Sequence, residues 1–458
     1  MKHHKGWSYA PYKPLFFDSG DIYICRLSNG DGFFQCDWLP VDGCEEYNLF
    51  YREKGSAEDF IKTAATKECT CKVSGLDKEK EYEFYVASGD KKSRVRYTVC
   101  RDSVGTVVNY LHPDDECYKF SGRYLCSPSL VRHPDGYILA SMDLFAPNHP
   151  QNLTLIFRSD DDGKTWKYVS ELFPCFWGKM FIHKGELYML SCSTEYGDML
   201  IGKSTDGGKT FTEPTVLFRG LNGKNGSCGV HRNPEPIVYF GGRIWNTVEW
   251  GSWGAWRHDA MVISADENSD LLDADSWCFS EPVRYNENWE GLPKGTSSGN
   301  IEGSLVVLDG KLYNIMRYDM TRLTPNYGLV IRYEVDTENP EAPLKYDGVI
   351  KLEGNHSKFM IKYDERTKKF YTIISRIIDT DHANARNLLS LMESEDCDTW
   401  TLKEDLLNYL HEDKKLVGFQ YVDFEIEGDK IIWLCRTAVN GAHNFHDANY
   451  QTFHVTKI

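Results

Sequence analysis

A hydrophobic pattern of eight residues recurs six times along the chain, and each copy is expected to form a β-strand. Each copy opens on a turn residue and continues as an apolar run, and five of the six end on a charged residue. The copies begin at Gly136, Gly185, Gly242, Gly310, Lys369 and Asp429. Their spacing of 49 to 68 residues suits units that are each one four-stranded blade of a β-propeller. The pattern predicts six blades.

The eighth position of each copy marks the same point on every strand, so these residues are expected to form a ring at one end of the wheel. They are Asp143, Cys192, Glu249, Arg317, Arg376 and Arg436. Two acids and three arginines in one ring predict a ligand site. The segment 452–455, near the end of the chain, is expected to pair with strands of the first blade, which would leave no free sheet edge.

Residues 20–103 show a different pattern, in which apolar and polar residues alternate with period two between turn residues. Trp38, Tyr47, Leu49, Tyr82 and Phe84 lie at positions that resemble the fibronectin type III pattern. The resemblance implies a seven-stranded β-sandwich that serves as a spacer or docking surface. The chain is therefore expected to be all-β, with an N-terminal segment over 1–19, a sandwich over 20–103 and a six-bladed propeller over 104–458.

Composition narrows the class of partner. The formal net charge is -16, and no basic stripe is present to neutralise phosphates, which argues against nucleic acid. No apolar run reaches the roughly 20 residues of a membrane span, and the first residues lack the apolar core of a secretory signal. We therefore expect a cytoplasmic protein that acts without a membrane.

The chain has 14 cysteines, many of them within apolar strand-like runs, where cysteine behaves as a small hydrophobic residue. Cys69 and Cys71 are the one close pair, and on a strand their side chains point to opposite faces. We expect buried free thiols, no structural zinc and no cofactor.

Two segments, 159–166 and 204–211, match the Asp-box pattern S-x-D-x-G-x-T-[WF], and a shorter copy lies at 394–400. The aspartate is expected to bond backbone amides of a hairpin turn, and the glycine to take a positive φ. Such turns lie on the rim of a wheel, away from substrate. Asp boxes on a six-bladed wheel resemble the sialidase superfamily.

The resemblance extends to four further positions. In NIEGSLVVLDGKLYNIMR, Glu302 and Arg317 take the places of a sialidase glutamate and of an arginine that grips the substrate carboxylate. Arg386 takes the place of the next arginine, and Tyr421, in GFQYVDF, that of the tyrosine nucleophile. The resemblance implies that Glu302 takes the proton of Tyr421.

Two sialidase positions are lost. Cys126 stands where the family has its first arginine, and Gln151 and Asn152 stand near the place of the aspartate that serves as general acid. A carboxylate substrate would thus lose one bidentate partner. The substrate is therefore expected to be an acidic or modified terminal sugar other than ordinary sialic acid.

Several residues are candidates for the missing acid. Asp143 is the first, because it ends its strand nearest the missing aspartate, although it could instead form a salt bridge that orients an arginine of the ring. A neutral sugar would favour a pair of carboxylates, drawn from Glu302, Asp143, Glu249 or Asp423.

Polar and aromatic connections add candidate ligand contacts. His231 and His356 lie in Gly- or Asn-containing segments, where they could contact ligand or act as hydrogen-bonded loop anchors. The segment 247–260 is expected to be a loop whose indoles, Trp253 among them, stack on a sugar face or pack between blades.

The expected function is that of an exo-acting glycoside hydrolase on a terminal sugar of an oligosaccharide. A second reading is a polysaccharide or oligosaccharide lyase, in which Tyr421 and His231 move the proton and Arg317 neutralises a uronate carboxylate. A third is a carbohydrate-binding propeller without catalysis.

Overall fold

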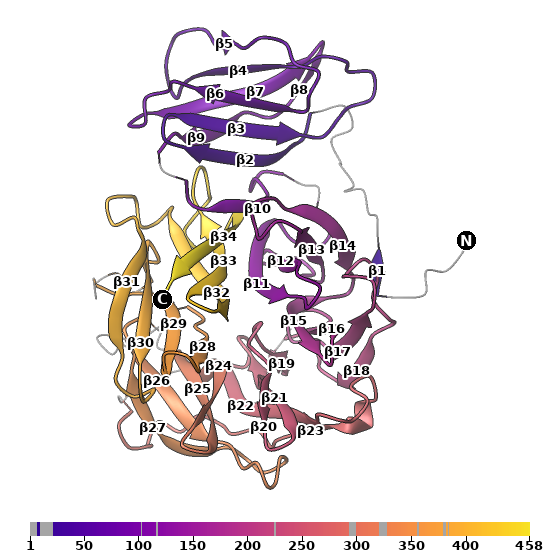
Figure 1. The fold of residues 1–458 in the computed structure, drawn as a ribbon, viewed down its shortest axis with the longest axis vertical. Helices are drawn as coiled ribbons and strands as arrows, with labels where there is room; N and C mark the ends of the chain where they lie inside the picture. Colours follow the sequence, from indigo (N-terminus) through magenta and orange to yellow (C-terminus); the bar gives the residue numbers. More distant parts are fainter. Residues whose placement is uncertain are drawn as a thin grey trace.

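The computed structural model describes residues 7–9, 22–101, 103–115, 118–223, 226–292, 299–319, 328–354, 357–378, 382 and 384–458. Its described residues form β-strands joined by turns, with one short 3-10 turn at Ala274–Ser276. A wheel of six antiparallel blades lies below a small β-sandwich (Figure 1). The predicted fold class, a six-bladed β-propeller preceded by a sandwich, is confirmed.

The first three blades follow one another along the chain. Blade one has β11 (Tyr124–Arg132), β12 (Ile138–Phe145), β13 (Thr154–Ser159) and β14 (Lys167–Leu172), and β1 (Ser8–Tyr9) joins its outer edge. Blade two has β15 (Phe176–His183), β16 (Glu186–Cys192), β17 (Met199–Ser204) and β18 (Thr215–Phe218). Blade three has β19 (Gly229–His231), β20 (Val238–Phe240), β21 (Arg243–Ser252), β22 (Arg257–Asp266) and β23 (Trp277–Phe279).

The other three blades complete the circle. Blade four has β24 (Gly299–Leu308), β25 (Lys311–Asp319), β26 (Leu329–Glu334) and β27 (Lys345–Lys351). Blade five has β28 (Ile361–Asp364), β29 (Lys369–Ser375), β30 (Leu388–Ser394) and β31 (Thr401–Asn408). Blade six has β32 (Gly418–Glu427), β33 (Lys430–Ala438), β34 (Tyr450–Lys457) and β10 (Thr106–Tyr110). The six repeated patterns lie on β12, β16, β21, β25, β29 and β33, the strand that follows the inner strand of each blade.

The wheel closes within blade six. β34 pairs antiparallel with β33 on one side and with β10 on the other, with Tyr450 opposite Tyr110. The expectation that 452–455 would pair with strands of blade one is wrong, because β32 to β34 supply three strands of blade six and the segment before blade one supplies the fourth. This pairing covers the edge that β34 would otherwise leave open.

The sandwich has two sheets. One contains β2 (Ile24–Gly30), β3 (Phe33–Trp38) and β6 (Thr70–Ser74). The other contains β4 (Asn48–Glu53), β5 (Ile61–Lys62), β7 (Glu81–Ser88), β8 (Lys91–Lys92) and β9 (Arg96–Val99). Alternate residues of β3, namely Phe34, Cys36 and Trp38, are buried, as the period-two pattern predicts.

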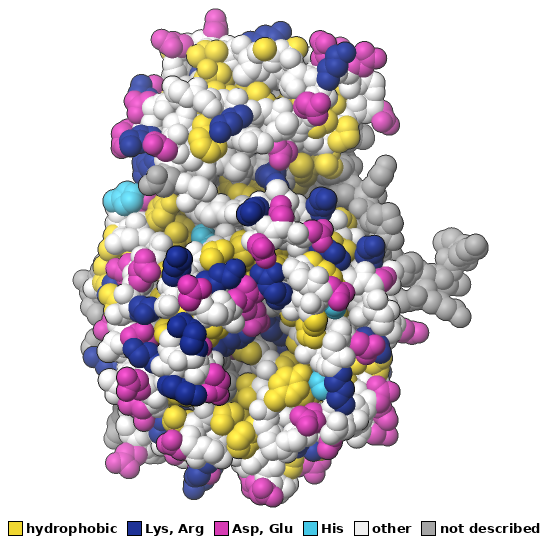
Figure 2. Space-filling view, in the orientation of Figure 1, with side chains coloured by type: hydrophobic (Ala, Val, Ile, Leu, Met, Phe, Trp, Pro, Cys, Tyr) yellow, Lys and Arg dark blue, Asp and Glu magenta, His cyan; other side chains and the backbone are white. Residues whose placement is uncertain are grey.

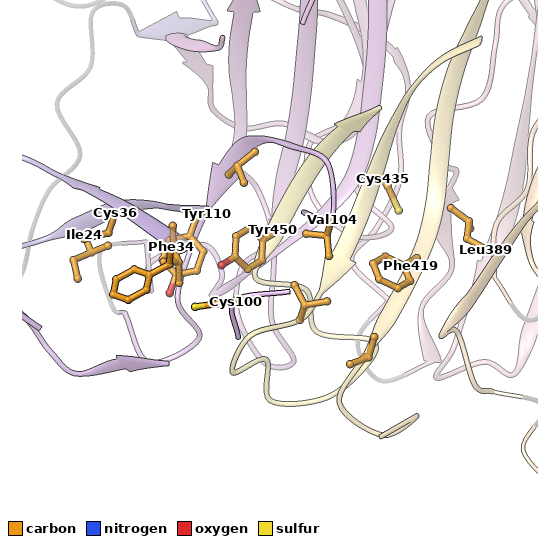
Figure 3. Close-up of a cluster of buried hydrophobic side chains, with 14 of the residues drawn as sticks. Ile24, Phe34, Cys36, Cys100, Val104, Tyr110, Leu389, Phe419, Cys435 and Tyr450 are labelled. Carbon is orange, nitrogen blue, oxygen red and sulfur yellow. The ribbon is translucent and has the colours of Figure 1, made fainter. Parts of the chain in front are cut away.

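One hydrophobic cluster joins the sandwich to the propeller. Phe34 and Cys100 of the sandwich region belong to the same buried cluster as Tyr110, Tyr450 and Phe419 (Figure 3). The rings of Tyr110 and Tyr450 lie 4.8 Å apart between centroids. Therefore β10 and β34, the strands that close the propeller, also form the surface on which the sandwich packs.

The surface carries charge of both signs. On the face shown in Figure 2, lysine and arginine side chains are interspersed with aspartate and glutamate. Among the described residues, no helix is long and apolar enough to cross a membrane.

A buried ion pair ties three inner strands together. Lys179 Nζ of β15 lies 2.5 Å from Asp423 Oδ2 of β32, and both side chains are buried. The same carboxylate oxygen accepts a hydrogen bond of 2.8 Å from the backbone N–H of Leu130 on β11. The expectation that Asp423 would serve as a site carboxylate is wrong, because its charge is used to hold Lys179 and blade one.

We predict that Asp423→Asn lowers the free energy of unfolding by about 3–5 kcal/mol, because it leaves the Lys179 ammonium buried without its counter-charge. Asp429→Asn, in the exposed turn between β32 and β33, is the matched control and should change it little. Denaturant titration of both variants measures the effect. A loss below about 1 kcal/mol for Asp423→Asn would contradict the structural role of the pair.

Candidate active site

Residues from all six blades line a central cavity of about 430 Å³, within the range of small-ligand sites. The inner strands of blades one, two, four and six contribute Ser127, Trp177, Glu302 and Tyr421. The other polar lining residues are Asn148, Gln151, Glu195, His231, Asn233, Arg317, Arg386, Arg436 and His446. The radial arrangement predicted from the repeats thus brings Glu302, Arg317, Arg386 and Tyr421 to one cavity.

Four lining residues on the inner strands share an unusual backbone conformation. Ser127, Trp177, Glu302 and Tyr421 have φ of 46°, 54°, 56° and 57°. Each lies at a shift in register between its inner strand and the next strand of the blade. A bulge of this kind redirects a side chain, and left-handed backbone in a non-glycine residue is strained. Four blades therefore use one backbone device to turn a side chain into the cavity.

Tyr421, Glu302 and Arg317 form a hydrogen-bonded group. Tyr421 Oη donates to Glu302 Oε1 over 3.0 Å. Arg317 Nη1 donates to Glu302 Oε2 over 2.5 Å and to Tyr421 Oη over 3.3 Å. The carboxylate of Glu302 thus receives the phenol on one oxygen and the guanidinium on the other.

The environment sets the protonation of this group. Burial alone would raise the pKa of Glu302, but the charge and hydrogen bond of Arg317 bring that pKa below its ordinary value. Burial, and then the charge of Glu302, raise the pKa of Tyr421, while the nearby arginines offset part of this. At neutral pH the carboxylate is ionised and the phenol keeps its proton, so Glu302 is placed to accept it.

Three guanidinium groups surround the phenol. The guanidinium carbons of Arg386 and Arg436 lie 5.7 and 5.1 Å from the centroid of the Tyr421 ring, and Arg317 contacts its hydroxyl. Burial lowers the pKa of Arg386 to about 10, which leaves it charged at neutral pH. The sequence resemblance predicted the loss of one arginine at Cys126, whereas Arg436 brings the arginines among the described lining residues to three.

His231 lines the cavity, with Glu249 behind it. The His231 Nδ1–H donates to Glu249 Oε2 over 2.6 Å, and the imidazole packs edge-on against Trp177, with 4.4 Å between centroids. Glu249 is 1% exposed and does not line the cavity. Its predicted direct contact with substrate is wrong, because its carboxylate is occupied in orienting His231.

Asp143 also lies behind the cavity wall. It is fully buried and accepts hydrogen bonds from the Thr154 hydroxyl and, over 2.6 Å, from the backbone N–H of Trp177. Burial raises the pKa of Asp143 to about 7. The prediction that it faces substrate as the general acid is wrong, because its carboxyl holds the bulge at Trp177 and does not line the cavity.

Arg376 does not join the ring. Its guanidinium pairs with Asp405 over 2.8 Å and with Ser390 Oγ over 3.2 Å, on the outer strands of its own blade. In blade four, Leu308 pairs with Lys311 and Arg317 follows six positions later, whereas in blade five Asp364 pairs with Lys369. The corresponding position is therefore Ser375, and the shift of one residue turns Arg376 to the opposite face.

The tryptophan segment is mainly extended, and the prediction of a loop over 247–260 is wrong. β21 continues to Ser252 and β22 begins at Arg257, so the turn covers only 253–256. Gly251 and Gly254 favour a loop, but the long pairing of β21 with β22 keeps most of this segment extended. Trp253 lines the cavity and is 39% exposed.

His356, another predicted ligand contact, lies outside the described residues.

Sequence reasoning missed Glu195, the second carboxyl of the cavity. It lies in the turn between β16 and β17, three residues after Cys192, the eighth position of the second repeat. Because the eighth positions of the repeats lie at the end of the propeller that carries the cavity, a carboxyl three residues beyond one of them could have been predicted as a site residue. Among the described residues, no three histidine, cysteine or acidic side chains come together as a metal site requires.

The fold of this chain is similar to that of known carbohydrate enzymes, although no family model and no curated protein matches its sequence. An α-L-arabinofuranosidase variant from Fusarium graminearum, bound to an iminosugar inhibitor, has 13% identity and a TM-score of 0.51, over 77% of this chain and 97% of that one. An α-L-arabinanase from Penicillium chrysogenum, complexed with arabinobiose, has 15% identity and a TM-score of 0.50 over the same shares. The sialidase NanB from Streptococcus pneumoniae has 9% identity and a TM-score of 0.50, over 96% of this chain and 93% of that one. At these identities the likeness shows the propeller fold alone.

Proposed function

We propose that the protein is an exo-acting glycoside hydrolase of the sialidase-like type, acting on an acidic or modified terminal sugar of an oligosaccharide. The observation that carries the proposal is the contact of Tyr421 with Glu302 and Arg317 inside a cavity that also holds Arg386 and Arg436. A purely structural role would not require an ionised carboxylate beside a phenol in a cavity.

In the proposed reaction Tyr421 is the nucleophile. Its oxygen bonds to the anomeric carbon as Glu302 accepts the phenol proton over the existing 3.0 Å hydrogen bond. A neutral phenol avoids the repulsion that a carboxylate nucleophile would meet if the anomeric carbon bears its own carboxylate. The three guanidinium groups supply the positive charge and the paired donors that such a carboxylate prefers.

The structural neighbours support a carbohydrate ligand. The arabinanase is complexed with a disaccharide, and the arabinofuranosidase variant with an iminosugar. The half-exposed Trp253 at the cavity fits this ligand class, because an indole face stacks on the C–H surface of a sugar ring.

We further propose that the sandwich is a fibronectin type III-like spacer and that the protein works in a reducing compartment such as the cytoplasm. Cys36 and Cys71 support the second point, because they lie opposite each other on neighbouring strands and both remain free thiols.

Elimination is a second candidate reaction. Glu249 binds His231 Nδ1, which leaves Nε2 as the nitrogen able to accept a proton, and Tyr421 could protonate the leaving oxygen. A lyase product contains an unsaturated uronate that absorbs ultraviolet light, whereas a hydrolase product does not.

We predict that Glu302→Gln and Tyr421→Phe each lower kcat by about 10² or more, because each removes a group of the proposed nucleophile. Glu365→Gln and Tyr363→Phe, at exposed positions, are the matched controls. A screen of aryl glycosides and natural oligosaccharides, with product absorbance recorded, measures the effect. Cleavage that survives both site variants would contradict the proposal, and affinity without any cleavage would indicate a binding propeller.

We predict that Arg436→Ala and Arg386→Lys weaken binding of an acidic sugar by about 10- to 100-fold, the loss of one charge-assisted hydrogen bond. Arg376→Ala, whose side chain faces Asp405, should leave affinity unchanged. Calorimetric titration with the acid and with its methyl ester tests the charge dependence. Equal losses of affinity for the acid and for its methyl ester would show that the arginines do not recognise the carboxylate.

A further inference from the structure

Glu195 is the carboxyl group of the cavity that the nucleophile does not use. Among the described lining residues, the carboxyl side chains are those of Glu195 and Glu302, and Glu302 is committed to Tyr421 and Arg317. We propose that Glu195 is the general acid that protonates the leaving glycosidic oxygen. The inference rests on the proposed hydrolase function and assigns the proton donor that this function lacks.

The backbone holds Glu195 in place. Ser193 N–H donates to Asp198 O over 2.8 Å, and Gly197 N–H donates to Thr194 O over 2.9 Å, which closes a tight turn between β16 and β17. The next residue, Tyr196, is buried, and its hydroxyl accepts from the backbone N–H of Trp253 over 3.1 Å. The turn is therefore anchored to the neighbouring blade three through Trp253, which also lines the cavity.

Gln151 orients the carboxyl. Its Nε2 donates to Glu195 Oε2 over 3.0 Å, and Gln151 itself is buried, with its backbone N–H donating to Ser121 O over 2.9 Å. An amide fixes one carboxyl oxygen and leaves the other to carry a proton. Because the amide is neutral, it orients the acid without the charge that would hold it ionised.

The two carboxyl groups of the cavity are held in opposite electrostatic environments. Burial raises the pKa of Glu195, which His231 and Gln151 offset only in part. Arg317 keeps the pKa of Glu302 below its ordinary value. Carboxyl groups whose environments push their pKa values apart divide the acid and base roles of a site between them.

The other titratable groups are less suited to donate this proton. Asp143 is fully buried outside the cavity lining. Burial lowers the pKa of His446 to about 4, so at neutral pH that imidazole is uncharged and lacks the acidic proton of an imidazolium. His231 Nδ1 is hydrogen-bonded to the buried carboxylate of Glu249, so the proton of that nitrogen is already held by another group.

In the first step the Glu195 proton passes to the glycosidic oxygen, and the bond from that oxygen to the anomeric carbon breaks with its electron pair on oxygen. Tyr421 Oη bonds to the carbon as its proton passes to Glu302. In the second step the Glu195 carboxylate takes a proton from water, the water oxygen bonds to the carbon, and Tyr421 leaves and recovers its proton from Glu302. Glu195, Tyr421 and Glu302 end in their starting states.

The test compares leaving groups that need protonation with leaving groups that do not. We expect Glu195→Gln to lower kcat/KM by about 10² or more for an alkyl or sugar leaving group, and by less than about tenfold for a nitrophenol. Glu195→Gln should also remove the fall in activity on the high-pH (alkaline) limb of the pH profile, because activity is lost as pH rises and Glu195 ionises. Glu186→Gln, at the other end of β16, is the matched control.

The outcomes separate the two proposals. If the wild-type protein cleaves neither series, the proposed function fails. If the wild-type protein cleaves both, and Glu195→Gln loses activity equally for every leaving group or keeps the alkaline fall, Glu195 is not the acid. Thermal unfolding and binding of the acidic sugar by Glu195→Gln show whether the variant remains folded, and Glu195→Asp, which retains the carboxyl, should recover part of the pH dependence.

Discussion

The site depends on one backbone constraint, the left-handed residue within the inner strands of four blades. At regular β geometry successive side chains of a strand point to alternate faces of the sheet, and a bulge turns an additional side chain of the inner strand toward the axis. Glu302 and Tyr421 take this conformation on blades four and six, and so their side chains meet. Buried groups maintain the geometry: Asp143 binds the amide of Trp177, and Lys358 Nζ donates to Val422 O beside Tyr421 over 3.1 Å.

Burial and the pairing of side chains set which groups of the cavity carry charge. Three arginines converge on a tyrosine in a space with two carboxyl groups, one ion-paired and one bound only by an amide. The similar folds bound to arabinobiose or an iminosugar differ greatly from this chain in sequence, so the shared scaffold leaves the chemistry to the side chains at its axis.

Much of this fold could be predicted from the sequence, because each repeated apolar run forms the equivalent strand of a separate blade. The site could be predicted only in part. Glu302 and Tyr421 were found through local motifs, whereas Arg376 was misplaced because the longer hairpin of blade five shifts the strand by one residue. Asp143 was misjudged because its burial depends on neighbours from blade two, and no local pattern reports the bulges of the inner strands.

The joining of β10 to β34 has a consequence for the order in which the molecule is made. A ribosome releases the sandwich and the first strand of blade six more than three hundred residues before the partner of that strand exists. Until then β10 exposes an unpaired edge, and Arg386, Tyr421 and Arg436 have not been synthesised. The ring therefore closes after translation of its last blade, and the cavity forms in that same event.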